Sequence, residues 1–240
     1  MSPSTAPAAF EGFGDATLDF LRDLTGNNEK PWFDAHRAEY DAAYLAPALA
    51  FVAAIGPRLQ AEVDARAQYE PRINGSLFRI QRDVRFSSDK TPYKTHLDLW
   101  FWYGDRKSWA TPGFFFRLTP ETLILGAGIH QFGPELVKAY RDRVVDNDFG
   151  RRLVECVDAV SAAGDYSIGG DTRKTVPRGF DAKHERARFL RHDGLHATHE
   201  ASVPAVAATH GFVDYCIERF KGVAPVNAWL MDALAPVASA

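Results

Sequence analysis

The sequence predicts an α+β protein in which an antiparallel sheet is flanked by helices at both ends of the chain. Apolar residues recur at helical spacing up to residue 67 and again after residue 135, whereas between residues 96 and 130 they follow a period close to two. Helices first, strands together and helices last is an α+β order, because a parallel sheet needs strands that alternate with helices. We therefore expect a central meander at about residues 96–130.

Three helices are expected before the sheet. The first begins near Asp15 and ends at the capping sequence of residues 26–28. Pro31 suits the first turn of the second helix, and Pro47 interrupts its pattern. A third amphipathic helix is expected over residues 49–67.

The strands follow an irregular stretch, residues 68–95, that is crowded with charge, Pro and Gly. Alternation begins at residues 97–103, where every second side chain is Leu, Phe or Tyr. A turn is expected at residues 104–107. Residues 113–118 and 122–129 then read as two further strands, and their short connections favour an antiparallel meander.

The rest of the chain is mainly helical. Helices are expected over residues 136–145, 149–163, 204–220 and 226–234. Residues 164–193 read as an irregular, basic connection, and residues 195–203 are expected to return as another strand.

Length and composition favour one domain. The chain has 240 residues, of which 46% are hydrophobic and 25% charged, and no stretch reads as a linker. We expect a single α+β domain over residues 10–240, preceded by a disordered tail, residues 1–9. The large share of Phe predicts aromatic layers in the core.

Charge and cysteine usage exclude several classes of protein. The net charge of −3 disfavours a protein dedicated to nucleic acid. Neither a signal peptide nor an apolar run long enough for a membrane span is visible. Cys156 and Cys216 lie in apolar helical patterns, as buried thiols of a reducing compartment do, so a cytoplasmic location is expected. No ligand spacing or nucleotide motif points to a metal or a cofactor, and we expect neither.

The first candidate segment surrounds Lys30 and Trp32. A helix N-terminus there would offer free amides to an anion, with Lys30 nearby. The alternative is a routine helix–helix corner, in which the asparagines cap and Trp32 packs.

The second candidate segment, residues 74–86, raises the question of what neutralises Arg82. In an extended segment Arg82 shares its face with apolar side chains alone, namely Phe78, Ile80, Val84 and Phe86. A buried Arg needs a carboxylate, a backbone carbonyl or a bound anion. The alternative to an anion is a structural Arg–Asp pair.

The third candidate segment, residues 76–96, is strongly basic. It holds five cations and two carboxylates, a local charge of +3: Arg79, Arg82, Arg85, Lys90, Lys94, Asp83 and Asp89. Tyr93 lies between the two lysines. This mixture suits phosphate, sulfate or carboxylate binding, and the alternative is a solvated loop whose charges contribute little.

Several strings of the chain resemble signature blocks of a known family: NNEKPWFDAHRAEY, GSLFRIQRDVRFSSDKTPYKTH, the pair PGFFFRL and GAGIH, and VPRGFDAKHERARFLRHDGL. They are similar to those of the family catalogued as domain of unknown function 2461, found in bacteria and fungi. The resemblance runs from about Phe10 to about Phe220. It implies a single-domain intracellular protein, and it carries no activity over to this chain.

Three functions remain open. The first is a binding module, or an uncharacterised enzyme, with a basic pocket for an anionic small molecule. The residues of that pocket would be Lys30, Trp32, Arg79, Arg82, Arg85, Lys90, Tyr93 and Lys94. The second is a structural or interaction protein in which the Arg/Asp cluster is an internal ion-pair network. The third is a hydrolase-type enzyme that uses Asp83 and His96 for acid–base chemistry.

Overall fold

The computed structural model describes residues 9–104 and 111–238, with side chains of the last helix described as far as Leu234. Residues 1–8 of the predicted N-terminal tail therefore lie outside the described residues. The turn predicted at residues 104–107 also lies outside them from residue 105 onwards.

The chain forms two compact units. Unit 1 comprises the residues up to Phe101 together with Phe115–Ile124 and Ala201–Glu218. Unit 2 comprises Trp102–Phe114, Leu125–Glu200 and Arg219–Ala240. The single domain expected over residues 10–240 stays a prediction.

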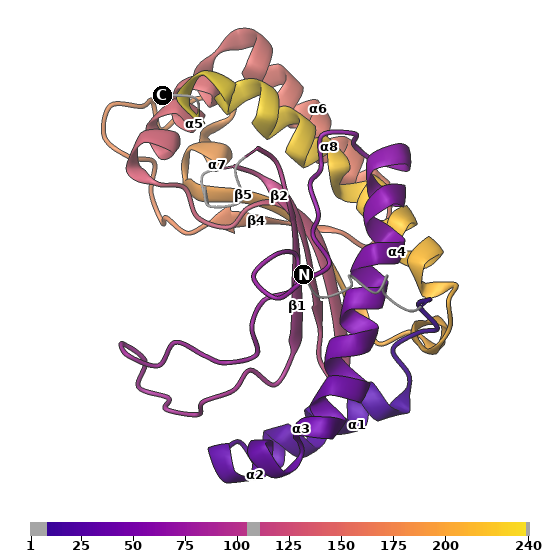
Figure 1. The fold of residues 1–240 in the computed structure, drawn as a ribbon. Coiled ribbons are helices and arrows are strands. Elements are labelled where there is room, and N and C mark those ends of the chain that lie inside the picture. The colour runs from indigo at the N-terminus through magenta and orange to yellow at the C-terminus, as the bar shows by residue number, and fades with distance from the viewer. Residues whose placement is uncertain (1–8, 105–110, 239–240) are drawn as a thin grey trace. The chain divides into compact units, whose positions relative to one another are not determined.

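The predicted antiparallel sheet is confirmed. Among the described residues, five strands pair in the order β1-β2-β3-β5-β4 (Figure 1). Their bounds are Leu97–Trp102 for β1, Gly113–Leu118 for β2, Thr122–Ile129 for β3, Ser167–Asp171 for β4 and His192–Ser202 for β5. Because β1, β2 and β3 are neighbours in both sequence and sheet, they form the expected meander.

Helices precede the sheet, as the sequence predicts. They are α1 (Asp15–Gly26), α2 (Lys30–Ala35), α3 (Arg37–Glu39), the π-helical turn η1 (Tyr40–Leu45) and α4 (Ala46–Glu62). Pro31 lies in the first turn of α2. The interruption expected at Pro47 is the wide turn η1, after which Pro47 occupies the first turn of α4.

Unit 1 has an aromatic core. Four phenylalanine rings meet with centroid separations of 5.3–6.1 Å. They come from four parts of the chain: Phe13 precedes α1, Phe51 lies on α4, Phe116 on β2 and Phe212 at the start of α8 (Phe212–Ala238). All four are buried, so the predicted aromatic layering is present here.

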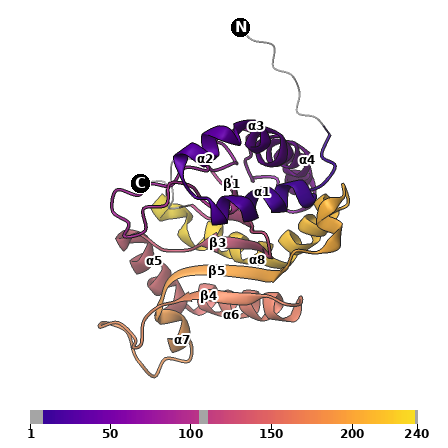
Figure 2. The ribbon, with the colours of Figure 1, turned by 90° about the horizontal axis from the view of Figure 1, so that it is seen from below.

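Unit 2 is built from helices α5 (Pro134–Val145), α6 (Asn147–Ala162) and α7 (Ala187–Leu190) around β5 and β4. Figure 2 shows α6 running alongside β4. Asp146 caps α6, because its carboxylate accepts hydrogen bonds from the amides of residues 148 and 149.

Two expectations about the C-terminal half were wrong. Residues 164–193 are not wholly irregular, since β4 pairs antiparallel with β5. The two predicted closing helices are a short 3₁₀ turn, η2 (Ala205–Ala208), and one continuous helix, α8 (Phe212–Ala238), which runs through Pro225. Burial of Phe220 and Val226 on either side of the break outweighs the cost of a proline inside the helix.

One stretch, Arg37–Glu62, is long and apolar enough to cross a membrane by length and composition alone. Half of its most apolar window is buried within the protein. Phe51, Val52 and Ile55 are fully buried there, as in the core helix of a soluble globular protein.

Candidate functional site

Two stretches of unit 1 lie side by side and carry most of the predicted site residues. Residues 76–82 pair antiparallel with residues 92–100 through backbone hydrogen bonds of 2.8–3.1 Å. Leu77 bridges to Leu99, and both side chains are buried, so an apolar pair sets the register. Residues 83–91 are therefore a loop that projects from two joined arms (Figure 1).

The aspartate at position 98 has three positively charged or imidazole side chains around it. Arg117 on the neighbouring strand β2 donates to it through both Nε and Nη2, at 2.7 and 3.0 Å. His96 Nε2 lies 3.1 Å from Oδ2, and Lys94 Nζ lies 3.8 Å from the same oxygen. The Asp98 side chain is only 14% exposed. We call Arg79, Lys94, His96, Asp98 and Arg117 the Asp98 cluster.

The contacts of Asp98 set its charge state. Burial by itself would raise the pKa of Asp98, but the hydrogen bonds from His96 and Arg117 outweigh burial and hold the pKa below its ordinary value. The same contact raises the pKa of Arg117. Asp98 and Arg117 are therefore both charged at neutral pH.

Lys94 is less well compensated. Burial lowers the pKa of its ammonium group, Asp98 opposes this effect, and Arg117 and Arg79 lower the pKa further by repulsion. At 3.8 Å its nitrogen is too far from Asp98 for a hydrogen bond. It lies 4.9 Å from the centre of the Phe78 ring, so an aromatic face stabilises part of the charge.

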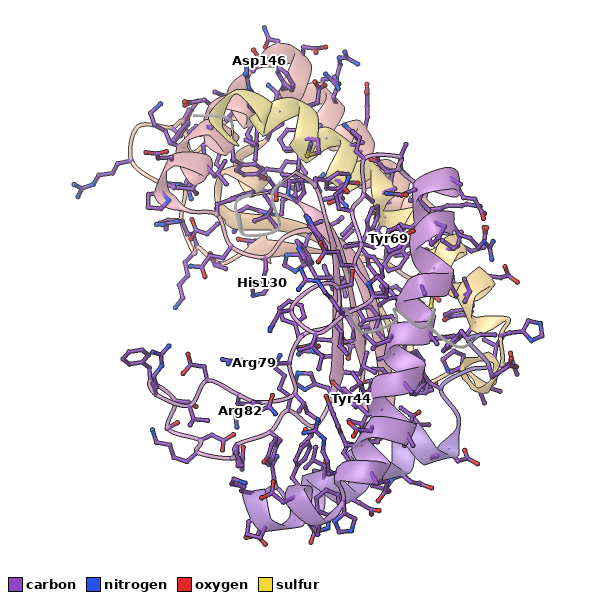
Figure 3. All side chains as sticks on the ribbon, viewed as in Figure 1. Tyr44, Tyr69, Arg79, Arg82, His130 and Asp146 are labelled. Atoms are coloured by element: carbon purple, nitrogen blue, oxygen red, sulfur yellow. The ribbon has the colours of Figure 1, made fainter. Side chains whose placement is uncertain are left out.

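Arg79 adds a further positive charge. Its side chain is exposed, and it lies on the same arm, residues 76–82, as Arg82 (Figure 3 labels both). Among the residues that the structure describes, no carboxylate forms an ion pair with Arg79. It acts on Asp83 and Lys94 only through its field.

The backbone of His96 is also held by the protein. The hydroxyl of Tyr44, on the π-helical turn η1, donates to the His96 carbonyl at 3.4 Å (Figure 3). Tyr44 is buried, and burial is the main cause that raises its pKa well above the ordinary value. Tyr44 therefore stays neutral and acts as a donor.

Arg82 is neutralised from within its own loop. It forms an ion pair with Asp89 and hydrogen bonds with the hydroxyl and the carbonyl of Thr91. The expected apolar face is not formed, because residues 83–91 are a loop and Phe86 is 96% exposed. For Arg82 the structure therefore has the Arg–Asp pair that was the alternative to a bound anion.

Arg85 and Asp83 form a second pair in the same loop. Arg85 donates to Asp83 through Nε and Nη2, at 2.9 and 2.7 Å. These side-chain bonds are the largest cause that lowers the pKa of Asp83, to about 2. A carboxyl group with so low a pKa is a poor proton carrier near neutral pH.

The remaining predicted residues lie around these pairs. Lys30 pairs with Asp34 on its own helix, and both are exposed. Lys90 donates to the backbone carbonyl of residue 84 at 2.9 Å. Trp32 stacks on the ring of His36, with 4.0 Å between centroids.

Tyr93 is a packing residue as well as a neighbour of the cations. Its ring stacks on Phe33 of α2 with a centroid separation of 4.2 Å, and its side chain is buried. Asn28 bonds its backbone. The contact brings α2 beside the arm formed by residues 92–100.

Asp98 and Arg117 were missed as site residues. Both had a visible signal: Asp98 is the one charged residue of the strand predicted at residues 97–103, and Arg117 is the charged residue of an otherwise apolar strand. Their pairing could not be read from either strand alone, because it depends on the register between β1 and β2.

The described residues contain no group of three or more His, Cys, Asp or Glu side chains that could hold a metal ion. The residues available for binding at the Asp98 cluster are cations and one imidazole. Guanidinium and ammonium groups of this kind bind phosphate or carboxylate oxygens.

Comparison with known proteins gives one match. A family model described as a conserved hypothetical protein, DUF2461, matches residues 16–229. The matched span includes the whole Asp98 cluster and confirms the resemblance carried by the sequence strings. Searches of curated proteins and of solved structures found no match.

Proposed function

Because the chain belongs to the DUF2461 family of conserved hypothetical proteins, whose description names no activity, we propose a function from its own geometry: it binds a small anionic molecule at the Asp98 cluster. The ligand carries a phosphate or a carboxylate group. Arg79 and Lys94 supply the charge that meets it, and Arg117 is held in place by Asp98.

The excess of positive charge over carboxylate carries this proposal. Lys94 and Arg117 lie beside one carboxylate, Asp98, whose oxygens already accept from Arg117 and His96. Arg79 adds a third positive charge that repels Lys94. Lys94 has a side chain only 21% exposed and lies 3.8 Å from Asp98. An anion that approached Lys94 would relieve both its partial desolvation and its repulsion from the two arginines.

The proposal narrows the set of residues expected from the sequence. Arg79 and Lys94 keep their roles, whereas Arg82 and Arg85 already have carboxylate partners, Asp89 and Asp83. Their expected part is to hold the loop, and Tyr93 supports the arm that carries Lys94.

A thermal-shift panel of inorganic phosphate, sugar phosphates, nucleotides and carboxylates tests the proposal. A ligand at a hundredfold excess over its Kd should raise Tm by about 5 °C or more for a chain of this size. Arg79→Gln and Lys94→Gln should abolish the shift. Arg85→Gln is the matched control and should keep it, because Arg85 is paired within its own loop. No shift with any member of the panel, or equal loss in all three variants, overturns the proposal.

A hydrolase-type enzyme is the second candidate, and the contact of 3.1 Å between His96 and Asp98 favours it. A carboxylate bonded to one ring nitrogen of a histidine orients the ring and leaves the other nitrogen for a substrate. The acid–base pair would then be His96 with Asp98, in place of Asp83. Turnover of p-nitrophenyl phosphate or p-nitrophenyl acetate that is lost in His96→Gln supports it, and absence of turnover counts against it.

A structural or interaction protein is the third candidate. The pairs Arg82–Asp89 and Arg85–Asp83 support it, since they satisfy charges of the loop internally. A cytoplasmic location fits all three candidates, because both cysteines are free and buried. The net charge of −3 again disfavours nucleic acid as the partner.

A further inference from the structure

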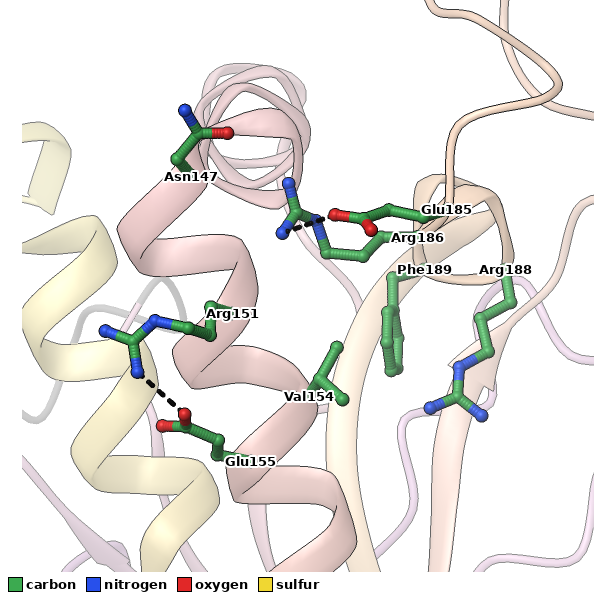
Figure 4. A pocket seen from close by; sticks show the side chains of 8 residues that line it. All are labelled: Asn147, Arg151, Val154, Glu155, Glu185, Arg186, Arg188 and Phe189. Carbon is green, nitrogen blue, oxygen red and sulfur yellow. Dashed lines mark hydrogen bonds and ion pairs between the residues drawn. The ribbon is translucent and has the colours of Figure 1, made fainter.

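A cavity of about 580 Å³ lies within unit 2, at a distance along the chain from every residue of the Asp98 cluster. Side chains of α6, of α7 and of the two residues just before α7 line it (Figure 4). Its volume falls in the range of small-molecule sites, roughly 300–1,000 Å³.

Arg186 is the most deeply buried charge in the lining of this cavity. The residue is 7% exposed, and its Nε has no hydrogen-bond partner. Its Nη2 reaches the carbonyl of Val145 at a long 3.4 Å. The carboxylate that pairs with its Nη1, at 3.1 Å, belongs to Glu185, whose side chain is 75% exposed. A buried guanidinium with one free N–H and one solvent-exposed partner is poorly compensated.

Gly150 leaves the space that the Arg186 guanidinium occupies. A Cβ atom at Gly150 would lie 2.6 Å from Arg186 Nε and 2.7 Å from its Cζ, so a larger residue would displace the guanidinium. The nearby carboxylate of Asp146 already accepts hydrogen bonds from the amides of residues 148 and 149, as the cap of α6. Arg186 is thus held against the first turn of α6, where the helix dipole is positive and a cation is disfavoured.

The other two arginines of the cavity differ in how they are compensated. Arg151 is paired with Glu155 at 2.7 Å and with Asp148 at 2.8 Å. Arg188 has no carboxylate partner within the described residues, and its guanidinium lies 4.5 Å from the centre of the Phe189 ring. The cavity therefore contains two arginines with capacity for an anion, Arg186 and Arg188.

The cavity also has an apolar side. Val154 and Phe189 contribute aliphatic and aromatic surface to the lining (Figure 4). Phosphate and other small inorganic anions make no use of such surface, whereas an organic acid with an apolar body does. Charge and apolar surface together select the class of ligand.

We propose that this cavity is a second binding site, for an organic monocarboxylate that carries an apolar group. The carboxylate accepts hydrogen bonds from Arg186, with Arg188 adding charge, and displaces Glu185 from Arg186. The apolar group lies against Val154 and Phe189. The proposal does not depend on the Asp98 cluster.

Binding of phenylacetate, followed by the side-chain Nε–H resonances of the arginines in ¹H–¹⁵N NMR spectra of the full chain, tests this site. Phenylacetate should shift the Arg186 resonance, and its neutral analogue phenylacetamide should not. Arg186→Gln should weaken phenylacetate binding about tenfold or more, because it removes charge-assisted hydrogen bonds. Arg151→Gln is the matched control and should change the affinity less than threefold, since Arg151 is paired elsewhere.

A gain-of-binding variant covers the case in which Arg186→Gln fails to fold. Glu185→Gln removes the carboxylate that competes for Arg186, so it should tighten phenylacetate binding several-fold. Equal binding of the acid and the amide, no binding at millimolar concentrations, or weaker binding in Glu185→Gln would each overturn the proposal. Loss of binding in Arg79→Gln would also overturn it, because that result assigns the ligand to the Asp98 cluster.

Discussion

Asn28 bonds both backbone groups of Tyr93 with the two ends of its side-chain amide. Its Nδ2 donates to the Tyr93 carbonyl at 2.9 Å, and its Oδ1 accepts from the Tyr93 amide at 3.0 Å. The amide thus makes the two hydrogen bonds that a neighbouring strand residue would make. Asn28 and Tyr93 are 65 positions apart in the sequence. Their contact therefore fixes the arm that carries Lys94 to the corner that follows α1.

Asn28→Ala should destabilise the protein by about 1–3 kcal/mol, because it leaves two partly buried backbone groups without their partner. Chemical denaturation checks the change in the free energy of unfolding. Asn27→Ala is the control: its amide makes one exposed bond to the carbonyl of residue 23, and we expect a loss below about 0.5 kcal/mol. Equal losses in the two variants would contradict a special role for Asn28.

Gly56→Ala should destabilise α4 although alanine favours helices over glycine by about 1 kcal/mol. A Cβ at this position would lie closer than 3.0 Å to ring atoms of Tyr69, so the ring packs against the helix at Gly56 (Figure 3 labels Tyr69). We expect a loss of about 1–3 kcal/mol in thermal unfolding. Gly26→Ala is the control: no atom lies within 4 Å of its added Cβ, and it should not destabilise. A stabilised Gly56→Ala protein would show that Tyr69 moves aside freely.

Much of the fold could be predicted from local sequence patterns. The meander was accessible because its strands alternate and are joined by short connections, and most helices because their apolar faces are periodic. Strand β4 could not be predicted from the local sequence, since two glycines in its five residues give it low strand propensity. It is a strand because it pairs with β5. The gap predicted between residues 220 and 226 was wrong for the same reason, because packing keeps α8 continuous through Pro225.

The basic segment could be predicted from the sequence, but most of its internal contacts could not. The charge density of residues 76–96, which include Arg79 and Lys94, is visible in the sequence, and a binding site there stays a prediction. Which cation meets which carboxylate depends on pairings that local sequence does not contain, namely Arg82 with Asp89 across a loop and Arg117 with Asp98 across two strands.

The pair Arg82–Asp89 should have a measurable coupling energy of about 0.5–1 kcal/mol, modest because both side chains are partly exposed. A double-mutant cycle with Arg82→Gln and Asp89→Asn, followed by chemical denaturation, gives this value. The coupling should shrink in high salt, since screening weakens partly exposed pairs. Strict additivity of the two variants would mean that the pair does not hold the loop in solution.

Acid should destabilise unit 2 through His196. Burial is the largest cause that lowers the pKa of His196, to about 4, and repulsion from His130 and His192 adds to it. In the unfolded chain the same ring takes up a proton near its ordinary pKa of about 6.5. The neutral ring therefore stabilises the fold above pH 6.5, and this contribution is lost as the pH falls from 6.5 towards 4.

We expect His196 to contribute a loss of about 2 kcal/mol in the free energy of unfolding between pH 7.5 and pH 4.5. His196→Gln should flatten this part of the pH profile even if the variant is less stable at pH 7.5, because the readout is the difference between the two pH values. His210→Gln is the control, since His210 is exposed, and it should keep the full slope. A slope unchanged in His196→Gln would show that other groups, such as His192, whose pKa burial also lowers, carry the acid sensitivity.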